Sequence, residues 1–538
     1  MYKEPTTLGT HDEIRLGISF EEKLFHSFYG LKQCWWQLQD FIDINHPELK
    51  QQFSAELQFL FPEASSFNEH ADPLEALAAG SSERRLSKES EQIFRLVWGI
   101  SKLIQLVSYS KPLQISFYNA AEADRVSLQF ISYLSYMKGN IKLRVHVGEV
   151  PTSWDEECRL LRCELLQLWK KSLHDTEEIE ERMKAVINNR SLSLDEKTAL
   201  SWFQNIESIN TCDIEETIQR YVMGGNYEAG LALIQKGIHT DRNKERLATF
   251  WMKKGLVYAF CGNYSKAIVC YKHLFSLSTS PQKRTATCMY LALLSSKRLD
   301  QEEEAQSWIK KGMEEAEMLE GKEADIEKGW LFNVRALSAF REKNYREALQ
   351  YSQAALKRIM NHQAGDALHL KINVISNLSV LFEKMGLSEK ALTTWQKFDQ
   401  FITRNTTAAF SKTYYFRLGA LRVASGQQKE GIAYITRAYE IAKGIDDVFH
   451  AAFIAQELAI YAYNDNDYAQ AVHWLEHSAS MAVEFGDENL ASLQKRRIKI
   501  LQQNDSIMIK QKLDLGLPIT KIGRPFYPIH IPNPLIQQ

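Results

Sequence analysis

The sequence predicts a mainly α-helical solenoid that carries a small N-terminal α/β or mixed module. Three observations lead to this fold class: a short motif that recurs, a central region almost free of proline, and a local change to strand-like alternation between residues 110 and 150. Of the 12 prolines in 538 residues, only Pro281 lies between residues 152 and 517. A proline inside a helix costs about 3 kcal/mol, so this distribution indicates nearly continuous helix.

The recurring motif is a polar turn, a tyrosine and, three residues later, a small residue. It is Gly-Asn-Tyr-x-x-Gly at 225–230, Gly-Asn-Tyr-x-x-Ala at 262–267 and Lys-Asn-Tyr-x-x-Ala at 343–348, and a fourth copy ends at Ala471. Weaker copies supply the small residues Ala305, Ala391 and Gly431. A small residue is expected where two helices cross closely, so each copy predicts a helix pair whose second helix starts at the tyrosine. Pro281 after Ser280 predicts a helix start as well.

The copy around Gly255 contains Trp251, Gly255, Tyr258, Ala267 and Tyr271. These spacings resemble those of the tetratricopeptide repeat, which has a large–small–aromatic first helix and an alanine-then-aromatic second helix. Successive small residues are 37, 38, 43, 43, 40 and 40 positions apart. This exceeds the usual repeat of 34, and the resemblance is to the long-period arrays of bacterial peptide-sensing regulators and signal-transduction ATPases. The alternative is an unrelated all-helical domain.

Residues 113–117 and 141–147 predict two strands, with a helix ending near Tyr136 between them. The four residues Ala123, Asp124, Ser127 and Leu128 resemble the segment after the Walker B strand of large signal-transduction ATPases. The resemblance covers residues 45–150, but Tyr118 and Asn119 stand where that family has two acids, and no Gly-x-x-x-x-Gly-Lys-Ser/Thr occurs. Because magnesium and water activation need those carboxylates, the resemblance implies a degenerate module without hydrolysis. An unrelated small α/β cap is the other interpretation.

The expected organisation is therefore a module at 1–150, a helical connector at 151–210, a tetratricopeptide-like array at 211–505 and a proline-rich extended tail at 506–538. The tail holds five of the 12 prolines among apolar residues. Disordered tails are usually more polar, so this tail is expected to dock, either on its own array or on a neighbour. Its partner and the oligomeric state are left open by the sequence.

Composition narrows the functional class. Lys+Arg of 65 against Asp+Glu of 67 gives no net field that would favour nucleic acid or an anionic membrane. No apolar run approaches the roughly 20 residues that span a bilayer. The start of the chain lacks a secretory core, and the seven scattered cysteines are typical of a cytoplasmic protein with reduced thiols.

No catalytic constellation is evident in the sequence. His473-Trp-Leu-Glu-His477 spells the inverted zinc-peptidase motif, but it lies on the second helix of a repeat, where surface histidines are the expected interpretation. We expect neither an enzyme nor a metal nor any other cofactor.

The first helix of each tetratricopeptide repeat lines the concave groove, which is where the resemblance places a binding site. Counting from the small central positions gives these groove residues: Met252, Phe260, Tyr290, Lys297, Arg298, Asn333, Phe340, Arg341, Asn373, Ser376 and Lys384. Asparagine can pair with both groups of an extended backbone, and arginine or lysine can hold a carboxylate. Four cations against one acid, Glu383, predict a locally basic groove; the alternative is that the cations only solvate helix ends.

The sequence thus favours a non-catalytic scaffold that binds a protein or peptide ligand, one with acidic groups or a free carboxylate. Two alternatives stay open. One is a regulatory signalling protein built on an inactive ATPase module, and the other is an accessory subunit of a biosynthetic or modifying enzyme.

Overall fold

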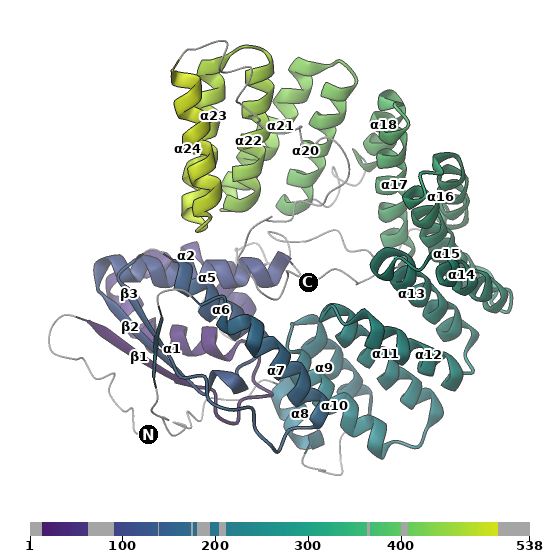
Figure 1. The fold of residues 1–538 in the computed structure, drawn as a ribbon, viewed down its shortest axis with the longest axis horizontal. Helices are drawn as coiled ribbons and strands as arrows, with labels where there is room; N and C mark the ends of the chain where they lie inside the picture. The colour runs from purple at the N-terminus through teal and green to yellow at the C-terminus, as the bar shows by residue number, and fades with distance from the viewer. Residues whose placement is uncertain are drawn as a thin grey trace. The chain divides into compact units, whose positions relative to one another are not determined.

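A computed structural model describes residues 13–62, 91–137, 139–173, 176–179, 194–203, 211–362, 366–399 and 407–503 (Figure 1). The described chain forms two compact units, the first reaching Leu277 and the second starting at Ser278. This division lies inside the predicted array. The structure is mainly helical with a small parallel α/β module, which confirms the predicted fold class.

The first unit begins with a parallel sheet in the order β1 (Ile14–Ser19), β2 (Leu113–Tyr118), β3 (Ile141–Val145) and β4 (Thr176–Glu178). The helices between these strands are α1 (Tyr29–Asn45), α2 (Pro47–Gln52), α3 (Ser54–Leu60), α5 (Glu91–Ser110), the 3-10 turn η1 (Ala120–Glu122), α6 (Arg125–Tyr136) and α7 (Glu156–Lys170). Strands that follow one another in the sequence are neighbours in the sheet, so every crossover connection moves in the same direction across it. Right-handed crossovers then place the connecting helices on one face of the sheet.

The two faces of the sheet differ in composition. Leu16, Ile115 and Phe117 are buried under the helices, whereas Arg15 and Lys142 on the opposite face are exposed. The two predicted strands correspond to β2 and β3. Strand β1 was missed, although Ile14, Leu16 and Ile18 alternate with less buried residues, which is the pattern of a half-buried strand.

The rest of both units consists of helix pairs. After α8 (Leu194–Phe203), the first unit has α9 (Thr211–Met223) with α10 (Tyr227–Thr240) and α11 (Lys244–Phe260) with α12 (Tyr264–Leu277). The second unit has α13 (Pro281–Leu299) with α14 (Glu302–Ala316), α15 (Gly321–Arg341) with α16 (Tyr345–Ile359), and α17 (Asp366–Lys384) with α18 (Ser388–Trp395) and the turn η2 (Gln396–Phe398). It continues with α20 (Ala408–Ala424) and α21 (Gln428–Gly444), α22 (Val448–Asn464) and α23 (Tyr468–Glu484), and ends at α24 (Glu488–Gln502), as Figure 1 shows.

One geometric rule holds for all seven described pairs. The second helix begins three residues before the small residue that the motif predicted, and that residue is buried in every pair. Two residues before each second helix the backbone has a positive φ of 57° to 82°, at Gly225, Gly262, Asp300, Lys343, Gly386, Gly426 and Asn466. In the clearest copy Asn263 N donates to Tyr258 O at 2.9 Å, the bond of a Schellman helix end. The weak copies at Ala305, Ala391 and Gly431 therefore fold like the strong ones.

A close crossing lies between Gly419 of α20 and Gly431 of α21. A Cβ atom added to Gly431 would lie 2.6 Å from the carbonyl oxygen of Gly419 and 2.5 Å from Val423 Cγ2. Since the first of these neighbours is backbone, the two helices would have to separate to admit a methyl group.

We expect Gly431→Ala to lower the stability of the second unit by about 1–3 kcal/mol, because overpacking outweighs the gain of about 1 kcal/mol in helix propensity. Gly444→Ala in the same helix is the control. A Cβ there meets nothing within 4 Å, so this variant should be neutral or slightly more stable. Thermal denaturation of both variants checks the pair, and equal midpoints would mean that the crossing tolerates a methyl group.

Helix α24 ends the described array with a polar side. Forty residues earlier, Ala455 and Ala459 of α22 are fully buried, and the equivalent residues of α24 are Lys495 and Lys499, both exposed. A second helix could not pack on those lysines without burying their charge. Helix α24 is therefore a capping helix, as solenoid ends require.

Candidate functional site

The predicted groove residues lie on the first helices of four pairs. Met252 and Phe260 belong to α11 in the first unit. In the second unit, Tyr290, Lys297 and Arg298 belong to α13, Asn333, Phe340 and Arg341 to α15, and Asn373, Ser376 and Lys384 to α17. The predicted set is therefore divided between the two units, with most of its members in the second.

Asn333 is almost completely buried, with 4% of its surface exposed. Its side-chain oxygen accepts a hydrogen bond from Asn377 Nδ2 at 3.0 Å, which joins α15 to α17. Ser376, the neighbour of Asn377, is half-buried. The structure therefore gathers amide and hydroxyl groups on adjacent first helices.

The predicted basic character of the groove is reduced by internal partners. Arg341 Nη2 lies 2.7 Å from Asp300 Oδ1, and Arg341 Nη1 donates to the carbonyl of Lys297 at 3.2 Å. Glu383, the one predicted acid, pairs with Arg417 of α20 at 2.6 Å. Lys384 is exposed at the end of α17.

The groove aromatics also have intramolecular neighbours. Phe340 packs against Tyr345 at 5.6 Å between ring centroids, and Phe260 stacks on Tyr227 at 6.0 Å. Met252 and Tyr290 are half-buried. Phe340 therefore helps to join α15 to α16 within one pair. Phe260 helps to join α11 to α10 of the preceding pair.

The histidines of the zinc-peptidase motif lie on α23. His477 Nδ1 is 3.0 Å from Tyr439 OH, and its ring centroid is 4.6 Å from that of His473. Among the residues that the structure describes, no group of three or more His, Cys, Asp or Glu side chains could hold a metal ion.

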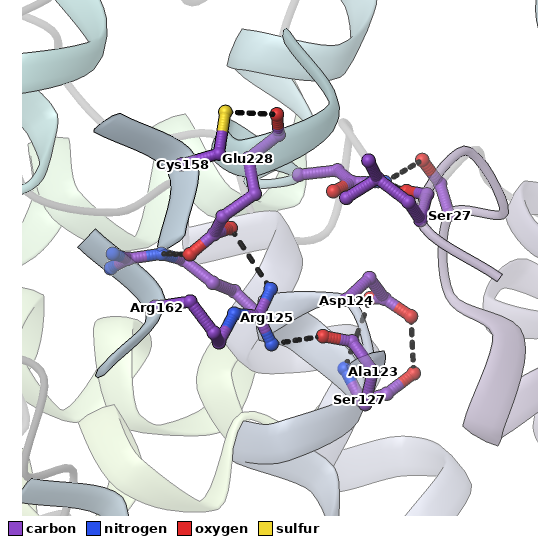
Figure 2. A network of polar contacts seen from close by, with 10 residues as sticks. Ser27, Ala123, Asp124, Arg125, Ser127, Cys158, Arg162 and Glu228 are labelled. Atoms are coloured by element: carbon purple, nitrogen blue, oxygen red, sulfur yellow. Dashed lines mark hydrogen bonds and ion pairs between the residues drawn. The ribbon is translucent and has the colours of Figure 1, made fainter. Parts of the chain in front are cut away.

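A buried ionic cluster, which the sequence reasoning missed, joins the α/β module to the first helix pair (Figure 2). Glu228 of α10 lies between two arginines: Arg125 Nε is 3.2 Å from Glu228 Oε1, and Arg162 Nη2 is 3.2 Å from Oε2. The side chains of Glu228 and Arg162 have no exposed surface, and that of Arg125 is 10% exposed. Burial alone would raise the pKa of Glu228, but the charges of Arg162 and Arg125 outweigh it and hold the pKa below its usual value.

Asp124 and Ser127, the residues of the ATPase-like segment, connect two helix starts. Asp124 caps α6 by accepting from Ser127 N, and its Oδ2 accepts from Ser127 Oγ at 2.5 Å and from Tyr29 N at 3.1 Å. Ser127 Oγ also accepts from Gly30 N at 2.8 Å. The N-termini of α1 and α6 are thus satisfied by side chains of this segment.

Further contacts fix the first two helix pairs to the module and to α7. Tyr221 OH donates to the carbonyl of Phe25 at 2.6 Å, and Asn226 Nδ2 donates to that of Leu24 at 3.1 Å. Glu157 of α7 accepts from Lys254 Nζ at 2.8 Å and from Tyr258 OH at 2.9 Å. The module, α7 and these pairs form one packed unit.

Glu228 could not have been singled out by its position in the motif. The corresponding residues of the other six pairs are exposed: Ser265, Glu303, Arg346, Glu389, Lys429 and Ala469. Only the partners reveal its role, and Arg125 is 103 residues away in the sequence.

The family model of the tetratricopeptide repeat matches residues 248–280. This range holds most of α11 and all of α12, the pair that the motif identified best. The chain therefore contains a tetratricopeptide repeat in α11 and α12. No curated protein sequence matches it.

Several solved structures are similar to this chain at low identity. Aspartyl phosphate phosphatase F from Bacillus subtilis is 14% identical over 61% of this chain and 84% of its own, with a TM-score of 0.37. A signal-transduction ATPase with a tetratricopeptide-repeat sensor from Pyrococcus horikoshii is 12% identical over 92% of this chain and 84% of its own, with a TM-score of 0.38. Within the described ranges of this chain, no helix has both the length and the hydropathy that crossing a bilayer requires.

Proposed function

We propose that this protein is a non-catalytic scaffold that binds a protein or peptide segment on the concave face of its first helices. The support is a polar group shared by adjacent first helices: Asn333 of α15 is hydrogen-bonded to Asn377 of α17, and Ser376 beside Asn377 is half-buried. Amides can pair with the N–H and C=O groups of an extended segment. Because Arg341 already pairs with Asp300, backbone recognition is favoured over capture of a carboxylate by that residue.

A photo-crosslinking residue placed at Ser376 tests the face directly. The partner is first captured on the full chain and identified by mass spectrometry, and the purified partner is then cross-linked to three single-site variants. Ser376 lies on first helix α17, Gln350 on the exposed side of second helix α16, and Ile44 on the module. We expect the partner to cross-link from position 376 and not from 350. Cross-linking from 350 alone would place the partner on the opposite side of the repeats.

A regulatory protein with a non-hydrolysing α/β module is the second candidate. The observation that favours it is the ionic cluster, which packs the module onto the first helix pair and would transmit a change in either. This candidate expects the partner to cross-link from Ile44 on the module. The same three variants therefore discriminate between the two functions.

A further inference from the structure

Strand β1 is an outer strand of the parallel sheet, and among the described residues no strand pairs with its free side. Phe20 N, just after β1, donates to the carbonyl of Tyr118 at 3.0 Å, and the register makes the even-numbered residues of β1 those that bond to β2. Backbone groups of successive strand residues point to opposite sides, so those of Arg15, Gly17 and Ser19 point away from β2. Such an edge offers its donors and acceptors to another strand.

Gly17, in the middle of this edge, has both of its backbone groups occupied by one side chain. Gln37 of α1 accepts from Gly17 N at 3.2 Å through Oε1 and donates to Gly17 O at 2.9 Å through Nε2. A primary amide carries the same kind of donor and acceptor as a peptide group. Gln37 therefore occupies the position that one residue of an added strand would take.

The contact between Gln37 and Gly17 is not needed to satisfy buried backbone groups. Gly17 is exposed and Gln37 is half-buried, so water could pair with the N–H and C=O of Gly17 equally well. What the side chain adds is exclusion: a strand that approaches β1 must first displace two hydrogen bonds of the edge. This is a means by which an exposed sheet edge can be protected.

A second copy of the chain fits along the whole of β1 in an antiparallel register centred on Leu16. In that register Arg15 lies opposite Gly17 of the second copy and Glu13 lies opposite Ser19, so no like charges meet. The register centred on Arg15 would instead oppose two arginines, which is unfavourable. In the register centred on Leu16, Arg15 and Gly17 exchange both of their backbone hydrogen bonds, which requires the two groups that Gln37 occupies.

We propose that Gln37 closes the β1 edge against a second copy of the chain, and that withdrawal of its amide turns this edge into a self-association surface. The two states use the same groups of Gly17, so the contact with Gln37 and the pairing of two β1 strands exclude each other. Such an interface is symmetric, because each copy presents the same strand to the other. The inference does not depend on the proposed function.

The test measures self-association of the full chain by sedimentation velocity over a wide range of protein concentration. We expect Gln37→Ala to self-associate at least about tenfold more tightly than the parent, because strand pairing then displaces no existing hydrogen bonds. Gln39→Ala is the control: Gln39 is also half-buried, but it lies two residues further along α1 and so points to another side of the helix. This control should associate like the parent.

A second substitution locates the association at β1. Arg15→Pro removes an N–H that points away from β2, which is where an edge strand tolerates proline, so Gln37→Ala with Arg15→Pro should return to the association of the parent. Should Gln37→Ala fail to fold, Gln37→Met decides in its place, because it keeps the side-chain volume and removes both hydrogen bonds. Equal association of the Gln37 variant and the parent, or association that Arg15→Pro leaves unchanged, would overturn the proposal.

Discussion

Replacing Glu228 with glutamine is expected to lower the local free energy of unfolding around α6, α7 and α10 by about 3–5 kcal/mol. The isosteric amide removes the negative charge but leaves Arg125 and Arg162 buried beside each other. An unpaired buried charge costs far more than the pair itself contributes, which is why breaking such a cluster is so destabilising. The loss should be confined to the first unit.

Glu216→Gln is the matched control for this prediction. Glu216 pairs with Arg220 one turn away on α9, but its side chain is 72% exposed, so the same substitution should cost less than about 0.5 kcal/mol. A triple variant, Arg125→Met, Arg162→Met and Glu228→Leu, removes every charge and should recover most of the loss. Hydrogen exchange of the α6 and α10 amides reports the local free energy without assuming two-state unfolding of the whole chain. Equal protection in Glu228→Gln and the parent would mean that Glu228 is not ionised in the folded protein.

The repeats and the ionic cluster differ in how far the sequence could predict them. A helix pair is a local structure: the turn residue with positive φ, the tyrosine and the small residue lie within six positions, as at 262–267. For this reason even the weak copy at Ala305, which has no tyrosine, marks a helix pair, and α14 begins at Glu302, three residues before the alanine. The turn residue of that copy is Asp300, whose φ is 57°, so the positive φ is adopted there without the glycine that would indicate it in the sequence.

The contacts that reach across the fold could not be predicted in this way. Strand β1 pairs with β2 almost a hundred residues later, and β4 has only three residues, too few for a periodic pattern. The groove cations show the same limit: counting positions placed Arg341 on the expected helix, but its ion pair with Asp300 depends on how consecutive pairs stack. Helical periodicity identifies the side of a helix that a residue occupies and leaves its partner undetermined.

The second unit contains another buried ionic cluster, formed by Lys412, Asp447 and His450. Lys412 of α20 is 1% exposed and donates to Asp447, the N-cap of α22. His450 Nδ1 lies 2.7 Å from Asp447 Oδ2 and 3.0 Å from Lys412 Nζ. We expect Asp447→Asn to lower the stability of this unit by about 3–5 kcal/mol, because the Lys412 ammonium then stays buried without its carboxylate.

Asp467→Asn separates the charge effect from the capping effect. Asp467 caps α23 by accepting from Gln470 N at 3.0 Å on an exposed surface, and asparagine caps about as well as aspartate. This control should change stability by less than about 0.5 kcal/mol. A double variant, Lys412→Met with Asp447→Asn, should be more stable than Asp447→Asn alone, since it removes the unpaired charge.

The pH dependence gives an independent check on Asp447. Burial alone would raise the pKa of this carboxyl group, but His450 and Lys412 hold the pKa well below its usual range. A carboxyl group with a depressed pKa stabilises the folded state at any pH above its unfolded value of about 3.9, and this contribution is lost as the pH falls towards the folded-state pKa. The difference in stability between the parent and Asp447→Asn should therefore be full near neutral pH and shrink below about pH 4. Denaturation curves of the two proteins across this pH range test the prediction: a difference that stays constant down to low pH would show that the charge of Asp447 is not what stabilises the unit.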